Sequence, residues 1–209
     1  TTGLVGSEMC IRDSYLSEQW FLKMEDLAKP AISAVRNKEI NFYPNHWVKT
    51  YNHWMDNIQD WCISRQLYWG HQIPVWYKKD ADRSNLDNWF VSTTPPTDLE
   101  NWEQDNDVLD TWFSSWLWPF AVHGWPDIKT TKYFPTNALV TGPDIIFFWV
   151  ARMIMSGYEF MGDLPFKDVY FTSILRDDKG RKLSKSLGNS PDPITCLLYT
   201  SDAADDGHS

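Results

Sequence analysis

The chain has 209 residues, 43% of them apolar, which is enough to build one domain or part of a larger one and excludes a disordered protein. Its net charge of -9 and its isoelectric point near 4.9 argue against a general nucleic-acid coat, although a local basic patch can still bind phosphate. Thirteen tryptophans exceed ordinary usage, so several rings should line a cavity or a tight seam as well as fill the core.

The two ends of the chain differ from the middle. Residues 1–14 (TTGLVGSEMCIRDS) and 195–209 (TCLLYTSDAADDGHS) show no usable hydrophobic period and no continuity with the segments beside them. They resemble the translated adapter sequence that contaminates metagenomic assemblies. We interpret both as non-native termini, and a pair of genuine frayed termini is the alternative.

The first half of the remaining chain alternates short helical and aromatic segments. Residues 18–40 predict one or two short helices, with Pro30 marking a break. Residues 41–77 alternate short aromatic runs with polar turns. The acidic, turn-rich residues 78–107 predict a surface excursion, after which dense aromatics return at 108–120.

The clearest local pattern is a strand followed by a turn and a helix. Residues 138–140 form a short apolar strand that leads into Gly142, Pro143 and Asp144. We expect Gly142 to permit a tight turn, Pro143 to suit the first helical turn, and Asp144 to favour the positive end of the helix dipole. Because residues 145–150 are apolar all round, the helix that follows should be buried on several sides.

A second strand, predicted over residues 168–175, delivers the chain into a basic loop. The order strand, helix, strand, loop is typical of an open parallel sheet in an α/β protein, whose ligands lie beyond the carboxyl ends of the strands. Asp144 and the loop sequence KLSKS at 182–186 both fall at such ends. The sequence therefore predicts one binding site that both of them share.

The basic loop has the chemistry of a phosphate-binding site. Five basic residues lie between positions 176 and 185, with glycines on either side of KLSKS that can act as hinges: Gly180 and Gly188. The ammonium groups of Lys182 and Lys185 and the hydroxyls of Ser184 and Ser186 are the donors that a triphosphate needs. A solvated basic loop without a ligand would look similar.

Cysteine usage and hydropathy restrict the remaining classes. Cys10, Cys62 and Cys196 have no C-x-x-C spacing and no histidine at ligand distance, so the sequence predicts neither a zinc site nor a disulfide framework. The longest apolar run, residues 145–155, is about half of a membrane span and contains Arg152. We expect a cytoplasmic chain that does not enter a membrane.

Five segments, in order, closely resemble the second half of the catalytic domain in the bacterial valyl-tRNA synthetases, a branch of the class I aminoacyl-tRNA synthetase family. KLSKS and its context match the second signature of class I. The resemblance covers residues 15–194. The segments are EQWFLKM (18–24), QDWCISRQLYWGHQIP (59–74), DNDVLDTWFSSWLWP (105–119), TGPDIIFFWVARMIMSGYEF (141–160) and RDDKGRKLSKSLGNSPDP (176–193).

The resemblance implies a fold and a division of the chain. The fold is the C-terminal half of the Rossmann-like parallel sheet of class I, with an inserted surface excursion. Residues 15–77 would return from an editing insertion into the catalytic domain, 78–107 would form the excursion, and 108–194 would complete the sheet and carry the KLSKS loop. The His-Ile-Gly-His type signature and an editing domain are not found in the sequence, so we expect negligible synthetase activity from the chain alone.

The resemblance also implies a reaction. Valine and ATP would give valyl-adenylate and pyrophosphate, and valine would then pass to the 3′ end of tRNA(Val). ATP is thus the expected substrate, Mg²⁺ is inferred to accompany it, and no zinc is expected. The parent enzyme is expected to be a monomer.

Site residues carry over from the matching motifs. Lys185 would contact the ATP phosphates most directly, with Lys182, Ser184 and Ser186 in support, and both lysines are the catalytic candidates. Gly142 and Asp144 match the element that approaches the ribose of adenosine. Trp69 and Trp112 match the indoles that wall the amino-acid pocket, with Val108 or Leu109 as an aliphatic contact.

Two alternatives stay open from the sequence. The chain could come from an isoleucyl- or leucyl-tRNA synthetase, although Ser114 and Ser115 follow Trp-Phe where the isoleucine enzymes have an acidic residue. A carbohydrate-binding module or glycosidase could also use many tryptophans and an acidic surface, because sugars stack on indoles and carboxylates hydrolyse glycosides. That reading leaves the basic loop unexplained.

Overall fold

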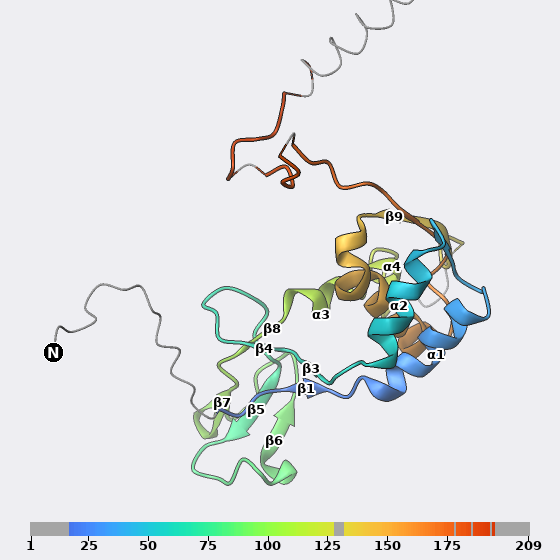
Figure 1. Ribbon diagram of the computed structural model, residues 1–209. Coiled ribbons are helices and arrows are strands. Elements are labelled where there is room, and N and C mark those ends of the chain that lie inside the picture. Colours follow the sequence, from blue (N-terminus) through green and yellow to red (C-terminus); the bar gives the residue numbers. More distant parts are fainter. Residues whose placement is uncertain (1–16, 128–131, 178, 185, 193, 195–209) are drawn as a thin grey trace, which may run out of the picture.

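The computed structural model describes residues 17–127, 132–177, 179–184, 186–192 and 194, and it shows a mixed α/β protein (Figure 1). The terminal segments 1–14 and 195–209 lie outside the described residues, so their interpretation stays a prediction. The α-helices are α1 (Glu25–Arg36), α2 (Trp47–Asp56), α3 (Thr111–Ser115), α4 (Trp118–Ala121) and α5 (Arg152–Ser156). The 3₁₀ and π segments are η1 (Leu86–Asn88), η2 (Leu99–Asn101), η3 (Pro143–Ile145), η4 (Ile146–Ala151) and η5 (Gly157–Met161).

The residues predicted to bind the nucleotide lie next to a three-stranded parallel sheet. Its order is β2 (Asn41–Tyr43), β10 (Phe166–Phe171), β9 (Thr136–Thr141), and both pairings are parallel. The parallel sheet predicted from the sequence is therefore confirmed. The strand predicted over 168–175 begins two residues earlier, at Phe166, and ends at Phe171, because β9 ends at Thr141 opposite Phe171 and leaves no partner for the ladder beyond it.

The helical stretch after β9 joins two strands of this sheet. It begins at η3, with Pro143 in the first turn as predicted, and continues through η4 and α5 to the end of η5. The predicted helix is thus confirmed, with π geometry in place of a regular α-helix at both ends. Residues 150–157 are buried, but Phe148 is 48% exposed, so the preceding apolar run is not buried on every side.

The prediction that Pro30 breaks the first helix was wrong. Helix α1 runs through it from Glu25 to Arg36. A proline inside a helix removes one N–H and frees the carbonyl four residues before it, which here belongs to Asp26. Both residues are exposed, so water can solvate that carbonyl and the helix tolerates the proline.

One hydrophobic core joins these elements. Helix α1 packs on α2 and α5, and buried side chains of β2, β3 and β10 meet the same cluster. Full burial of a large apolar side chain stabilises a fold by about 1.5–3 kcal/mol, so this cluster dominates the stability. The largest fully buried members of the core are Trp116, Tyr51, Phe42, Phe120 and Phe166.

The predicted excursion, residues 78–107, supplies two strands of a small antiparallel sheet that the sequence did not reveal, and the central strand of that sheet begins before residue 78. The order of this sheet is β6 (Trp89–Val91), β5 (Val75–Lys78), β7 (Trp102–Gln104), and it lies at the end of the molecule away from α1 and α2 (Figure 1). Two short antiparallel pairs connect it to the core. They are β1 (Phe21–Leu22) with β3 (Trp61–Cys62), and β4 (Ser64–Arg65) with β8 (Val108–Leu109).

The described residues lack two features, a cluster of metal-binding side chains and a membrane-spanning helix. Among them, no group of three or more His, Cys, Asp and Glu side chains could hold a metal ion. No helix in this part of the chain is long and apolar enough to cross a membrane. The single cysteine that the structure describes, Cys62, is a free thiol.

Candidate active site

The three predicted pocket residues line one cavity. It has a volume of about 400 Å³ and lies where β4 pairs with β8, with Trp69, Val108 and Trp112 in its wall. Strand β8 places Val108 there by pairing it with Arg65, and helix α3 begins three residues later and carries Trp112. The cavity is also lined by Leu67, Gly70, His71, Leu109, Asp110, Thr111 and Ser114.

Trp69 enters this wall from an exposed loop. Its side chain is 88% exposed, and the neighbouring Tyr68 is fully exposed. The loop is fixed at both ends, because Gln66 Nε2 donates to Asp107 Oδ2 at 2.8 Å and Gln72 Nε2 donates to the carbonyl of Asp105 at 2.7 Å. The indole is therefore held near the cavity by the loop ends rather than by packing of its own ring.

Glycine is required at the base of the same loop. A Cβ on Gly70 would lie 2.8 Å from Val108 Cγ2 and 2.9 Å from Val108 Cβ. Such distances are below van der Waals contact, so the absence of a side chain lets the loop approach the strand that carries Val108. Trp112, on the other wall, is half-buried and stacks on Phe148 with ring centroids 6.1 Å apart.

The nucleotide-site candidates lie at the carboxyl end of the parallel sheet. Thr141 ends β9, Gly142 and Asp144 follow it, and the basic loop returns to the same place, where Lys182 Nζ donates to Asp144 Oδ2 at 2.6 Å. This hydrogen bond lowers the pKa of the Asp144 carboxyl below its ordinary value, so the group is ionised at neutral pH. An ionised carboxylate can accept hydrogen bonds from the two hydroxyls of a ribose.

The expectation that Gly142 permits a tight turn was wrong. Its φ is -77° and its ψ is 149°, an extended conformation that other residues adopt readily. The glycine matters for space instead, because a Cβ there would lie 2.7 Å from Asp144 Oδ1. Gly142 thus leaves room for the carboxylate beside it.

The basic loop is organised by its own side chains. Asp177 accepts hydrogen bonds from Arg181 Nε at 2.8 Å and from Asn189 Nδ2 at 3.0 Å, and its pKa is lowered, chiefly by the bond from Asn189. The Oγ atoms of Ser184 and Ser186 lie 2.7 Å apart. The predicted hinge glycines have φ of +75° and +60°, left-handed values that favour glycine: Gly180 and Gly188. Lys185 lies outside the described residues.

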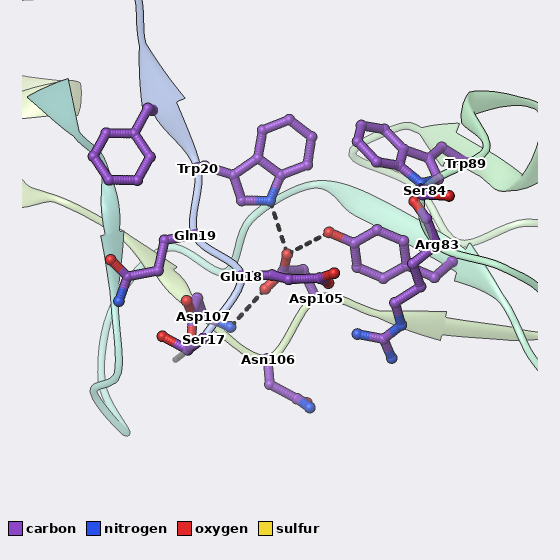
Figure 2. A pocket seen from close by; sticks show the side chains of 12 residues that line it. Ser17, Glu18, Gln19, Trp20, Arg83, Ser84, Trp89, Asp105, Asn106 and Asp107 are labelled. Atoms are coloured by element: carbon purple, nitrogen blue, oxygen red, sulfur yellow. Dashed lines mark hydrogen bonds between the residues drawn. The ribbon is translucent and has the colours of Figure 1, made fainter. Parts of the chain in front are cut away.

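A cavity larger than that of about 400 Å³ lies elsewhere in the described part of the chain and contains none of the predicted site residues. It measures about 730 Å³ and lies between residues 17–21 and the small antiparallel sheet. Figure 2 shows the carboxylate of Asp105 at its centre, where Oδ2 accepts hydrogen bonds from Trp20 Nε1 at 2.9 Å and from the Tyr77 hydroxyl at 2.8 Å. Burial, helped by this carboxylate, raises the pKa of Tyr77 to about 12.

The hydrogen bonds of Asp105 have a structural role: they help to place β8, and so one wall of the smaller cavity, from a position outside that cavity. Its Oδ1 accepts from the backbone N–H of Asp107 at 2.9 Å, one residue before the strand that carries Val108. The carboxylate thus joins the N-terminal segment, β5 and the approach to β8. Both carboxylate oxygens of Asp105 already accept hydrogen bonds within the protein, so Asp105 offers a bound molecule less than its central position suggests.

Two polar residues of the smaller cavity were not recognised from the sequence. They are Asp110 and Arg65, to which the sequence motifs assign no role in the pocket. Both line the cavity, and the Arg65 guanidinium donates to the Asp110 carboxylate. The spacing of Asp110 before helix α3 does signal an N-cap, but nothing in the sequence pairs it with a residue 45 positions earlier.

Comparisons with known proteins identify the family of the chain. The family described as tRNA synthetases class I (I, L, M and V) matches residues 11–204. The curated valine--tRNA ligase of Chlorobaculum tepidum is 58% identical over 201 residues, which cover 91% of this chain and 22% of that protein. The valine--tRNA ligase of Bacillus subtilis is 56% identical over 189 residues, with coverages of 88% and 21%. The chain therefore spans about a fifth of the length of these relatives.

Solved structures share the fold. The methionyl-tRNA synthetase of Mycobacterium tuberculosis bound by methionyl-adenylate superimposes with a TM-score of 0.59 at 20% identity, covering 88% of this chain and 31% of that one. The LeuRS of Agrobacterium radiobacter K84, in a ternary complex with tRNA, gives 0.52 at 21% identity, with coverages of 66% and 22%. With a family match over most of its length and this fold, the chain belongs to the class I tRNA synthetases.

Proposed function

We propose that this chain is the second half of the catalytic domain of a valine--tRNA ligase, which makes valyl-tRNA(Val), AMP and pyrophosphate from valine, ATP and tRNA(Val). The observation that carries the proposal is the cavity that brings Trp69, Val108 and Trp112 together. Two indoles and a small aliphatic side chain suit a branched apolar ligand, and a rigid aromatic wall excludes larger ones by overlap. The names of the curated relatives support valine as that ligand.

In the first reaction the valine carboxylate attacks the α-phosphorus of ATP. A bond forms between the carboxylate oxygen and phosphorus, and the bond to the pyrophosphate leaving group breaks. No proton has to move, so the described residues need supply only positioning and charge. Lys182 and Lys185, with Ser184 and Ser186, would stabilise the phosphates, while Asp144 beside Gly142 would accept from the ribose hydroxyls.

In the second reaction a hydroxyl of the terminal ribose of tRNA(Val) attacks the carbonyl carbon of valyl-adenylate. The new ester bond forms as AMP leaves with the electrons of the broken mixed anhydride, and the proton of the attacking hydroxyl passes to the phosphate of the departing AMP. A slot of this kind cannot reject threonine strongly, and the valine enzyme is a standard illustration of that limit. Removal of the wrong product therefore falls to a part of the parent enzyme other than this cavity.

The remaining partners follow from this chemistry. Mg²⁺ would accompany the ATP phosphates and offset their negative charge. We further infer that zinc plays no part, that the parent enzyme is a cytoplasmic monomer, and that it binds no membrane. Each of these is an expectation of the proposed function.

A chimera tests the proposal. Residues 17–194 of this chain replace the matching segment of the Bacillus subtilis valine--tRNA ligase, and amino-acid-dependent exchange of pyrophosphate into ATP is measured with valine, isoleucine and leucine. We expect exchange with valine above both others. Exchange that prefers isoleucine or leucine would favour those synthetases, and exchange with none of the three would overturn the proposal. The isolated 209-residue chain is expected to show no exchange.

A further inference from the structure

Asp110 lies between two of the walls of the amino-acid cavity. It follows β8, which carries Val108, and it is the N-cap of α3, which carries Trp112. Its Oδ1 accepts from the backbone N–H of Trp112 at 2.7 Å, and its Oδ2 accepts from Arg65 Nη2. Only 8% of the Asp110 side chain is exposed, so a single buried carboxylate connects the two walls.

Arg65 is itself fixed in place. Its Nη1 donates to the backbone carbonyls of Cys62 at 2.9 Å and Ser64 at 2.7 Å, so the guanidinium is held against its own strand. Strand β4 pairs with β8 in a register that sets Arg65 opposite Val108. The Arg65–Asp110 ion pair therefore crosses from one edge of the cavity to the helix on the other side. Planar guanidinium groups give such contacts a defined geometry.

A second guanidinium, that of Arg152, interacts electrostatically with this pair. Arg152 is 5% exposed, its guanidinium carbon lies 3.5 Å from the ring centroid of Trp61, and its Nε and Nη1 have no hydrogen-bond partner among the described residues. Burial lowers the pKa of Arg152 to about 10, while the Asp110 carboxylate opposes that shift and Arg65 adds to it. Asp110 is thus paired with Arg65 and also offsets, at longer range, part of the cost of burying the Arg152 charge.

We propose that Asp110 is a positioning residue of the amino-acid pocket, whose charge, held by Arg65, sets the place of Trp112 relative to Val108. The inference rests on the proposed function and adds a specific residue to it. Loss of the charge leaves the Arg65 guanidinium without its ion-pair partner and removes an anion that offsets the buried charge of Arg152, which favours displacement of Arg65. Since small displacements of positioning groups have large effects on catalysis, valine binding should weaken while ATP binding, at the end of β9, should not.

A purely structural role for Asp110 predicts something different. As an N-cap, Asp110 would act only through the stability of α3, and asparagine is as good an N-cap as aspartate. Asp110→Asn keeps the size and the acceptor for the Trp112 N–H but removes the charge. It therefore separates the two roles, and Arg65→Gln removes the same ion pair from its more exposed side, where 39% of the side chain is accessible.

The experiment measures the KM of the chimera for valine and for ATP in pyrophosphate exchange. Asp110→Asn and Arg65→Gln should each raise the KM for valine about tenfold, with the KM for ATP changed less than about twofold. The double variant should be no worse than either single one, because both remove one interaction. The matched control is Asp56→Asn, which breaks the surface ion pair with Arg36 and should change neither constant.

Three results would overturn the inference. One is a valine KM that Asp110→Asn leaves unchanged. Another is a parallel rise of both KM values together with a lower melting temperature. If Asp110→Asn does not fold, Arg65→Gln decides alone, and an unchanged valine KM refutes the inference. An unmodified chimera without valine-dependent exchange is a separate outcome, which overturns the proposed function and this inference with it.

Discussion

Lys182 Nζ lies 2.6 Å from Asp144 Oδ2, although the two residues are 38 positions apart in the chain. One belongs to the basic loop and the other to the first turn after β9, so the contact fixes the loop against the carboxyl end of the parallel sheet. These are also the side chains proposed to meet the phosphates and the ribose of ATP. Nucleotide binding must therefore compete with their mutual attraction.

The first prediction concerns pH. The folded pKa of Asp144 is lowered from 3.8, so its charge and its ion pair are present above that value and are lost only as the pH falls through the lower, folded pKa. Both partners are exposed, so the pair contributes less than about 1 kcal/mol to stability. We expect the ATP KM of the chimera to show no titration by Asp144 between pH 5.5 and 8. A pKa in that window that disappears in Asp144→Asn would contradict this.

The second prediction concerns Gly142. Alanine there would press on Asp144 Oδ1, which can rotate away at little cost to folding but would leave its place beside Lys182. Gly142→Ala should raise the KM for ATP severalfold and change the free energy of unfolding by less than about 0.5 kcal/mol. Gly162→Ala is the control, because its φ of +69° with no atom nearby should cost about 1 kcal/mol of stability and leave the ATP KM unchanged. Enzyme kinetics and urea unfolding of both variants distinguish the two.

The third prediction separates the two tryptophans of the pocket. Trp69 is 88% exposed, so Trp69→Ala should raise the KM for valine and change the free energy of unfolding by less than about 0.5 kcal/mol. Trp112 is half-buried and stacks on Phe148, so Trp112→Ala should raise the valine KM and also destabilise the chimera by about 1–3 kcal/mol. An unchanged valine KM in Trp69→Ala would remove that indole from the pocket.

The fourth prediction concerns Gly70. An added methyl would overlap Val108, and overpacking of this kind typically costs about 1–3 kcal/mol. Gly70→Ala should therefore lower the urea midpoint and raise the valine KM together, since it displaces both the loop and a wall of the cavity. A second substitution in the same chain, Val108→Ala, should reduce this overlap and recover part of the lost stability. The absence of any recovery would show that the strain lies elsewhere.

Local patterns in the sequence were sufficient to predict the parallel sheet. The strand before Gly142, the helix after Asp144 and the strand before the basic loop each carry a strong signal, and right-handed crossover connections leave few ways to assemble them. Gly180 and Gly188 also occur where left-handed backbone is needed. These elements depend on short stretches of chain, which is why a single sequence contains them.

Features that depend on tertiary contacts could not be predicted in the same way. Pro30 stays within a helix because the freed carbonyl reaches solvent, which a local pattern does not reveal. The strands β6 and β7 are three residues each among many turn residues, and they form only by pairing with β5. The Arg65–Asp110 ion pair likewise joins two distant segments, and local signals for turns and strands do not show that these segments lie side by side. The roles of Trp69 and Trp112 came from resemblance, since an isolated tryptophan is more often part of a core.

The size of the amino-acid slot is the most direct test of this account. Val108 is 5% exposed and lines the cavity, so Val108→Ala should make room for one more methylene. The measurement is the ratio of kcat/KM for isoleucine to that for valine in pyrophosphate exchange by the chimera. We predict a rise of about tenfold or more, because one methylene in such a pocket changes selectivity by that order. An unchanged ratio would show that this cavity does not hold the amino-acid side chain.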